Sequence, residues 1–243
     1  METEGLEALY KKYNPYLVEI RKRLMLLVVI FVLNGVIGFI YYERIVRLIL
    51  DMLDLRGVNV VFTSPFQFFE LSVSTGMLVG IAVTLPIIVY NFLSFIRPAL
   101  SKREFNTIRV MTPFSLILFI IGFGAGFSIM RYVVMIFYEN SQKLDIGNFL
   151  DITKLLSQIL VTAGLMGVAF QFPIVVTLLI RLNAVPRQFF VRQRPIAYGI
   201  SILFAAILPP TDILSMVILT LPLVFLFEGT LLLNKILVKP KGR

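Results

Sequence analysis

Long apolar runs, separated by short charged segments, form the main pattern of this chain. A helix needs about 20 apolar residues, at 1.5 Å each, to cross the hydrocarbon core of a bilayer. Four charge-free runs are long enough. With a short extension of the last two, they predict membrane-spanning helices over residues 24–42, 71–96, 110–136 and 154–180.

Two shorter apolar runs follow, at residues 195–208 and 213–227. Each reaches only about 21–23 Å as a helix, which is less than the hydrocarbon core of about 30 Å. The sequence Pro-Pro-Thr-Asp between them is too tight for anything but a hairpin. We therefore expect two short antiparallel helices, over 195–208 and 213–233, that thin the membrane locally.

Proline residues interrupt three of these spans, at Pro86, Pro173 and Pro222. Each removes a helix hydrogen bond and favours a kink. The small-residue spacing of Gly122 and Gly126 is typical of a surface where helices pack closely. The predicted fold class is all-α: a polytopic membrane protein with one integral domain over residues 1–243. Its six membrane-inserted helices, the last two short, form a kinked and cupped bundle.

The segment after the first span mixes apolar residues with charged ones. Residues 43–54 combine seven aliphatic side chains with Glu43, two arginines and two aspartates, which predicts a helix lying on the membrane surface. Further on, Ser64 and Pro65 precede the second span. Serine favours the N-cap and proline the first helical position, so this pair predicts the start of that helix.

Composition narrows the chemistry that the chain can perform. Hydrophobic residues make up 58% of the 243 positions, charged residues only 15%, and the mean hydropathy is +0.90, whereas soluble domains are about a quarter charged. Cysteine and histidine are both absent, which removes thiolate chemistry and the commonest general base and metal ligand. No phosphate-binding motif is present. We expect no enzymatic activity, no metal and no cofactor.

The distribution of positive charge predicts the orientation. If the N-terminus is cytoplasmic, that side of the membrane carries 17 of the Lys and Arg residues and the other side carries 6. Positive residues concentrate on the cytoplasmic side, so both termini are predicted to be cytoplasmic, in the inner (plasma) membrane of a cell. The net charge of +9 is thereby explained by topology, and we expect no nucleic-acid partner.

Two glutamates stand on the predicted cytoplasmic side. Glu19 lies at the edge of the first span, and Glu104 is the one acid among four cations in the following cytoplasmic loop. Glu19 could simply pair with Arg23 one helical turn away, and Glu104 could be a solvated neighbour of Arg103. From the residues alone, these local roles and a ligand-binding role remain open.

Three polar side chains fall within or beside the later spans. Gln171 lies inside the fourth span, Asp212 in the short hairpin, and Glu228 near the end of the last span. A polar group in lipid needs a partner, so Gln171 either bridges two helices or belongs to a hydrated concave face. Ionisable groups at membrane depth are candidates for function.

Five short motifs, in order and spacing, resemble those of the TatC family over essentially the whole chain. The family has a Leu-x-Glu-Leu-Arg-x-Arg-Leu run before its first span, which residues 17–24 match with Ile20 in place of one leucine. The other matches are Ser64-Pro65, then Phe95, Pro98, Leu100 and Glu104, then Pro210 and Asp212, and finally Pro222 with Glu228.

This resemblance implies the core receptor subunit of the twin-arginine translocase. Such a protein binds the twin-arginine signal peptides of folded export substrates on the cytoplasmic face and nucleates a translocase driven by the proton gradient. Implied partners are small single-span subunits of the TatA and TatB type, further copies of the chain, and the lipid bilayer. Glu19 and Glu104 are the expected arginine readers. Arg21 would orient Glu19, while Phe95, Pro98 and Arg103 would shape the site.

One position departs from the family. A glutamate is common in the fourth span, where this chain has Gln171, so we interpret the position as an intramembrane polar patch and not as a proton relay. The alternative function is a small-solute secondary transporter or channel, with Gln171, Asp212 and Glu228 along the substrate path. That class is expected to show paired broken helices and internal symmetry, which the sequence lacks.

Overall fold

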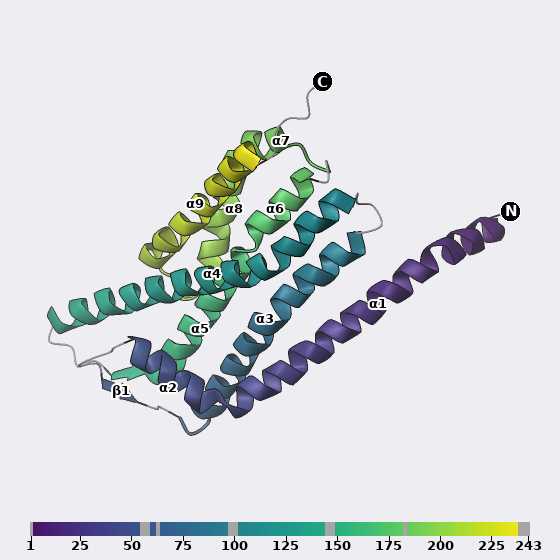
Figure 1. Cartoon of the computed structure of the whole chain (residues 1–243). Helices are drawn as coiled ribbons and strands as arrows, with labels where there is room; N and C mark the ends of the chain where they lie inside the picture. Colours follow the sequence, from purple (N-terminus) through teal and green to yellow (C-terminus); the bar gives the residue numbers. More distant parts are fainter. Residues whose placement is uncertain are drawn as a thin grey trace.

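The computed structural model describes residues 2–53, 59–61, 64–96, 102–143, 149–181 and 184–237. Apolar helices dominate it, as the sequence predicts, and they run side by side (Figure 1). The helices are α1 (Glu2–Ile40), α2 (Tyr42–Leu53), α3 (Gln67–Ile96), α4 (Lys102–Lys143), α5 (Ile152–Ala169), α6 (Phe172–Arg181), α7 (Arg187–Arg192), α8 (Arg194–Ile207) and α9 (Ile213–Leu237).

Among the described residues, five helical stretches are long and apolar enough to cross a membrane: Val18–Ile40, Gln67–Leu85, Pro113–Asn140, Thr153–Arg181 and Ile213–Ile236. The apolar helix α8 is shorter, with 14 residues. Many large apolar side chains face outward on these stretches, as expected for helices surrounded by lipid. The all-α polytopic class is therefore confirmed.

The last helix is longer than the sequence predicts. α9 has 25 residues and reaches about 37 Å, so of the last two helices only α8, at about 21 Å, is short. The predicted helix ended at residue 233, whereas α9 continues to Leu237; Glu228 lies within it, and its carboxylate is paired with Arg194 of α8.

The three span prolines have different consequences. α3 continues through Pro86 and α9 continues through Pro222. In the fourth span, α5 ends at Ala169 and α6 begins at Phe172, so the break lies directly before Pro173. Pro173 sits in the first turn of α6, where its missing N–H disrupts no helix hydrogen bond. Only this proline coincides with an interruption in the described helices.

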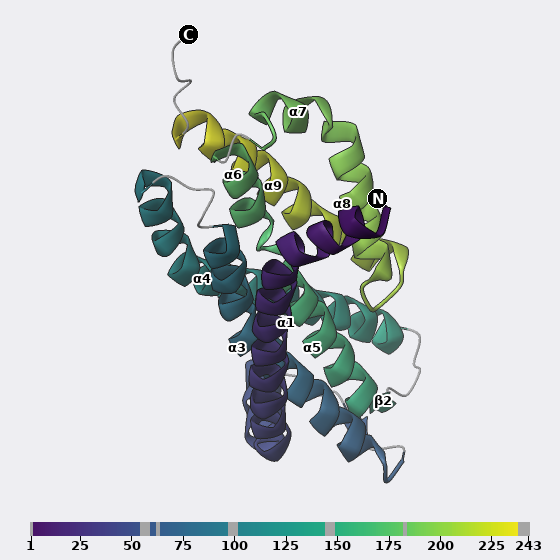
Figure 2. The same cartoon turned by 90° about the vertical axis from the view of Figure 1, so that its right-hand side faces the viewer.

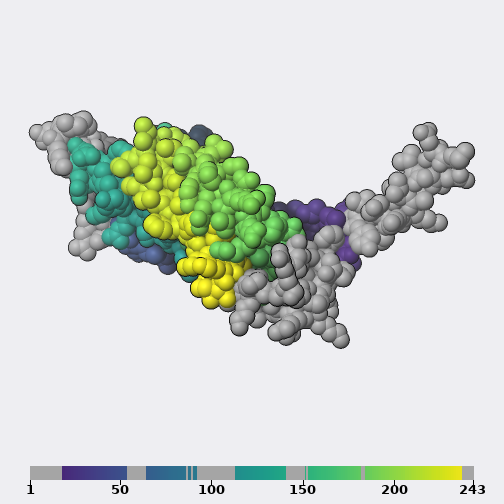
Figure 3. Space-filling view, turned by 90° about the horizontal axis from the view of Figure 1, so that it is seen from above, coloured from purple at the N-terminus to yellow at the C-terminus, as the bar shows by residue number. Residues whose placement is uncertain are grey.

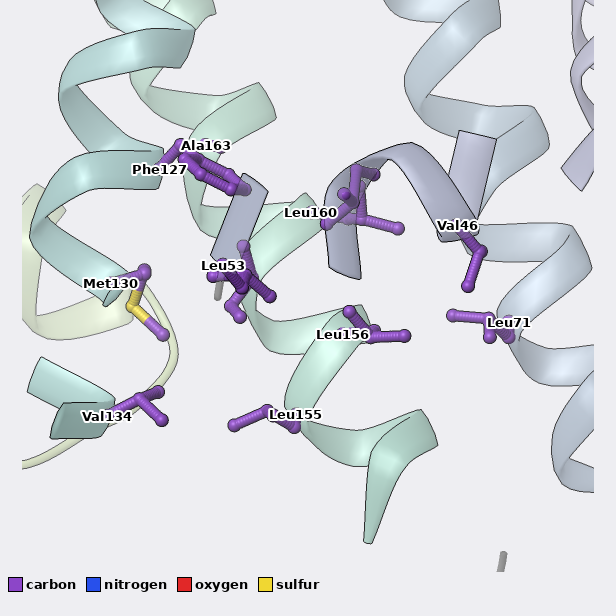
Figure 4. Close-up of a cluster of buried hydrophobic side chains, with 12 residues drawn as sticks. Val46, Leu53, Leu71, Phe127, Met130, Val134, Leu155, Leu156, Leu160 and Ala163 are labelled. Carbon is purple, nitrogen blue, oxygen red and sulfur yellow. The ribbon is translucent and has the colours of Figure 1, made fainter. Parts of the chain in front are cut away.

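The core at one end of the bundle joins α2, α3, α4 and α5. Its members are Val46, Ile49, Leu53, Leu71, Phe127, Met130, Val134, Leu155, Leu156, Ile159, Leu160 and Ala163 (Figure 4). Leu53 lies among the α4 and α5 side chains, and Val46 lies near Leu71 of α3. The helix predicted over 43–54 is present as α2, but its apolar face packs against the bundle as well as bordering the membrane.

Glycines bring neighbouring helices into close contact. A Cβ on Gly122 would lie 2.7 Å from the Met166 carbonyl oxygen, and one on Gly126 would lie 2.9 Å from the Ala163 Cα, so this α4 surface packs directly on α5. The predicted packing role is confirmed for both. A similar contact between α1 and α3, which the sequence analysis missed, places Gly35 and Gly76 face to face.

A small sheet, absent from the prediction, lies beside α2. Strand β1 (Asn59–Val61) pairs in parallel with β2 (Phe149–Asp151), with Asn59 opposite Phe149. Asp151 then caps α5 by accepting hydrogen bonds from the backbone N–H groups of Thr153 and Lys154, and it also accepts one from Gln67 Nε2 at 2.6 Å. Strands of three residues are too short to show an alternating pattern.

Side chains cap the start of two helices, of which the sequence predicted the first, with a shifted boundary. Ser64 Oγ accepts from the Phe66 N–H at 3.4 Å, although regular α3 begins only at Gln67, with Pro65 in the turn before it. Asp212 caps α9, accepting from the Ser215 N–H at 2.8 Å and from the Ser215 hydroxyl. The Thr162 hydroxyl donates to the Pro209 carbonyl and so ties the hairpin to α5.

Candidate functional site

The elements that carry the predicted binding residues meet at one end of the bundle. α1 and α8 begin there, α3, α6 and α9 end there, and α4 starts there (Figure 1). A view from another direction shows α7 joining α6 to α8 at the same end (Figure 2). The predicted arginine readers on α1 and α4 therefore belong to the same end.

Glu19 projects from α1 and is paired within its own helix. Arg23 donates to Glu19 Oε1 through Nε at 3.1 Å and also through its second terminal nitrogen. The remaining Arg23 nitrogen donates to the Asn91 carbonyl of α3 at 3.0 Å. The local pair considered from the sequence is thus present, and it also connects α1 to the last turns of α3.

Glu104 occupies the first turn of α4, three residues after the connection from α3. Because Arg23 bonds to Asn91 five residues before α3 ends, Glu19 and the start of α4 lie at the same end of neighbouring elements. Phe95 lies in the last turn of α3 and Arg103 in the first turn of α4. The side chains of Phe95, Arg103 and Glu104, and all of Pro98, lie outside the described residues.

A shallow open hollow of about 420 Å³ runs along α1, on a face of the helix that does not include Glu19. Its lining from this helix is apolar apart from the exposed Arg21, which the prediction placed beside Glu19. Two helical turns of α1 thus offer an apolar surface beginning at the level of the Glu19 carboxylate. The lining residues are Ile20, Arg21, Leu24, Met25, Val28 and Val29.

Gln171 is buried and its amide is satisfied by neighbouring helices. The Ser115 hydroxyl of α4 donates to Gln171 Oε1 at 2.8 Å. Gln171 Nε2 donates to the carbonyls of Ser115 at 3.2 Å and Gly167 at 3.3 Å. Of the two roles left open by the sequence, the geometry favours a bridge across the α5–α6 break over a hydrated face.

We expect Gln171→Leu to lower the stability of the protein by about 1 kcal/mol, because it removes an interhelical hydrogen-bond network of modest net strength. Adding Ser115→Ala to Gln171→Leu should lower the stability little further, because the glutamine side chain that Ser115 contacts is already absent. Thermal melting of the four purified proteins in detergent gives the coupling. Fully additive losses from the two substitutions would contradict the bridge.

Glu228 also has protein partners. Arg194 at the start of α8 donates to Glu228 Oε2 at 2.8 Å, and the Tyr198 hydroxyl donates to Oε1 at 2.7 Å. α8 and α9 lie side by side on one face of the molecule, in green and yellow (Figure 3). Glu228 therefore joins these two helices. Sequence analysis missed Arg194 and Tyr198, although an acid within a span requires such a donor.

The polar residues of the later spans thus serve packing and capping. Gln171, Asp212 and Glu228 are each bonded to protein groups of the described helices. Within the part of the chain that the structure describes, no group of three or more acidic, cysteine or histidine side chains is placed to hold a metal ion.

Comparison with known proteins gives a consistent result. Residues 15–222 match the family model of TatC, Sec-independent protein translocase protein. TatCy of Bacillus subtilis (strain 168) is 28% identical over 226 residues, covering 90% of this chain and 87% of that protein. TatC of Carboxydothermus hydrogenoformans is 27% identical over 227 residues, covering 93% of each.

Solved structures show the same arrangement of helices. A crystal structure of the twin-arginine translocase receptor TatC in the detergent DDM superimposes with a TM-score of 0.78, at 25% sequence identity. The match covers 89% of this chain and 98% of that one. A second crystal structure of the same receptor gives a TM-score of 0.76 at 24% identity.

Proposed function

The chain belongs to the TatC family of Sec-independent protein translocase proteins, and on that basis we propose that it is the receptor that binds twin-arginine signal peptides. It is a multi-pass membrane protein, and its role in Sec-independent translocation follows from the family. The observation that carries the proposal is an exposed carboxylate, Glu19, at the end of the bundle where Glu104 lies in the first turn of α4.

In this proposal, the end of the bundle that carries Glu19 and the start of α4 faces the cytoplasm. α1 begins and α9 ends at that end, which also holds the two connections rich in Lys and Arg. The excess of positive residues there, 17 against 6, supports a cytoplasmic location for both termini in the inner membrane. Signal peptides of newly made proteins would meet this face first.

Carboxylates suit the recognition of paired arginines. A guanidinium can donate two parallel hydrogen bonds to one carboxylate, and a lysine ammonium cannot reproduce that fork. We assign one arginine of the peptide to Glu19 and the other to Glu104. Arg21 orients Glu19, while Phe95, Pro98 and Arg103 shape the recess from the end of α3 to the start of α4.

The hollow along α1 supplies the second half of the site. A signal peptide carries an apolar stretch after its arginines, and the apolar residues from Ile20 to Val29 follow Glu19 along α1 toward the membrane, on another face of that helix. Apolar contact there adds affinity without sequence specificity. Gln171 is buried and bonded to Ser115 of α4, and it does not line this surface.

The receptor acts with partners and without catalysis of its own in this proposal. The partners are single-span subunits of the TatA and TatB type and further copies of the chain, which assemble around the bound signal peptide in the bilayer. Energy comes from the proton gradient, since the sequence has no nucleotide-binding motif.

A binding measurement tests the proposal. A fluorescent signal peptide with Arg-Arg should bind the purified protein in detergent about tenfold more tightly than the same peptide with Lys-Lys, because only arginine makes both charge-assisted bonds. Glu19→Gln and Glu104→Gln should each remove most of this difference. Glu139→Gln, at an exposed position near the opposite end of α4, is the matched control because it also removes one negative charge. Equal binding of both peptides to the wild type would refute the receptor assignment.

A further inference from the structure

The Glu19 carboxylate already holds a guanidinium in this structure. Arg23 approaches it from one turn further along α1, and two of its nitrogens converge on a single oxygen, Oε1. The other terminal nitrogen of Arg23 is fixed by the Asn91 carbonyl of α3. Oε2 takes no part in the pair. The geometry is that of a bound arginine, supplied by the protein itself.

The pair is accessible to exchange. The Glu19 side chain is 50% exposed and that of Arg23 is 26% exposed, so neither is sealed within the protein. Ion pairs of this kind, four residues apart on a helix surface, contribute only a few tenths of a kcal/mol. An incoming cation of similar chemistry can therefore compete with Arg23 for the carboxylate, while Arg23 keeps its contact with Asn91.

Arginine and lysine ligands face this competition differently. A guanidinium that binds through both carboxylate oxygens must displace Arg23 from Oε1. An ammonium needs one acceptor and can take Oε2, which leaves Arg23 where it is. The internal pair thus weakens binding of the arginine ligand more than binding of the lysine ligand.

We propose that Arg23 is a positioning and affinity-setting residue, which occupies Glu19 as an internal stand-in for a signal-peptide arginine and is displaced when the peptide binds. This inference rests on the proposed receptor function. Arg23 holds the Glu19 carboxylate at a fixed position against α3. Because Arg23 competes for that carboxylate, the affinity for a peptide arginine is lower than it would be without Arg23. Release of the bound peptide is then assisted, because Arg23 returns to Oε1.

The test compares Arg23→Gln with Lys22→Gln in the full-length protein. Both substitutions remove one positive charge from adjacent positions, but the exposed Lys22 has no place in the pair. Titration uses synthetic signal peptides with Arg-Arg and with Lys-Lys. Arg23→Gln should tighten Arg-Arg binding about two- to fivefold, the effect of losing one surface ion pair, with a smaller change for Lys-Lys. Lys22→Gln should shift both peptides equally.

The outcomes separate this inference from the receptor assignment. If the wild type does not prefer Arg-Arg, the receptor function itself fails. If the preference exists but Arg23→Gln shifts both peptides equally, only general charge is involved and the stand-in role is overturned. Arg23→Lys keeps the positive charge and serves as a second variant in case Arg23→Gln does not fold. It should bind the Arg-Arg peptide more tightly than the wild type does, and unchanged binding would also overturn the role.

Discussion

Gly122→Leu is expected to leave little folded protein, because α4 and α5 touch at that glycine. A Cβ there would meet Phe170 Cγ at 2.6 Å and the backbone oxygen of Met166 at 2.7 Å, and a backbone atom cannot rotate away as a side chain can. Forcing extra atoms into a close-packed contact typically lowers stability by 1–3 kcal/mol, and a leucine against the backbone should exceed about 3 kcal/mol. Melting temperature and elution profile in detergent measure the loss.

Gly124 provides the matched control two residues away in the same helix. A Cβ at Gly124 meets no atom within 4 Å, so Gly124→Leu adds an apolar side chain to a lipid-facing surface. Leucine is also the better helix former by roughly 0.8 kcal/mol or less. We expect Gly124→Leu to melt at or above the wild-type temperature. Equal melting of the two leucine variants would show that the α4–α5 contact is looser than described.

Arg194→Leu is expected to destabilise the pairing of α8 with α9 by about 2 kcal/mol. The substitution leaves the Glu228 carboxylate inside a span with Tyr198 as its remaining donor, and an unpaired charge in that setting is unfavourable. The loss should stay below the 3–5 kcal/mol typical of fully buried pairs, because the two side chains are 43% and 35% exposed. Thermal melting in detergent gives the value.

The double variant Arg194→Leu/Glu228→Leu is the informative comparison. Removing both charges replaces the pair with two apolar side chains, which is often neutral or stabilising. We expect it to melt above either single variant. If the double variant instead loses the sum of the two single losses, the two residues act independently and their ion pair does not stabilise the pairing of α8 with α9.

The sequence predicts the membrane-spanning helices well, since apolar length alone determines them. It ends the last helix at residue 233, four residues before the observed end at Leu237, and it does not identify the partner of Glu228. Arg194 lies 34 residues before Glu228, and no local pattern connects the two. The break between α5 and α6 was indicated by Pro173, whereas Pro86 and Pro222 carry the same signal without interrupting their helices.

The candidate site likewise has some features that the sequence predicts and others that it does not. Glu19 could be chosen from its place in a family motif, and its local pair with Arg23 follows from helical spacing. The bond from Arg23 to Asn91 and the bond from Gln171 to Ser115 could not be predicted, because each depends on how two helices pack side by side. Short strands such as β1 and β2 give no periodic signal at all.

The burial of α2 has a consequence for biosynthesis. α1 and α3 meet through glycines close together in the sequence, so that contact can form early as the chain leaves the ribosome. The apolar face of α2, with Val46 and Leu53, is covered by Leu156 and its neighbours on α5, which are synthesised about 100 residues later. We therefore expect α2 to pack first on Leu71 of α3 and to have its apolar face fully covered only when α5 arrives.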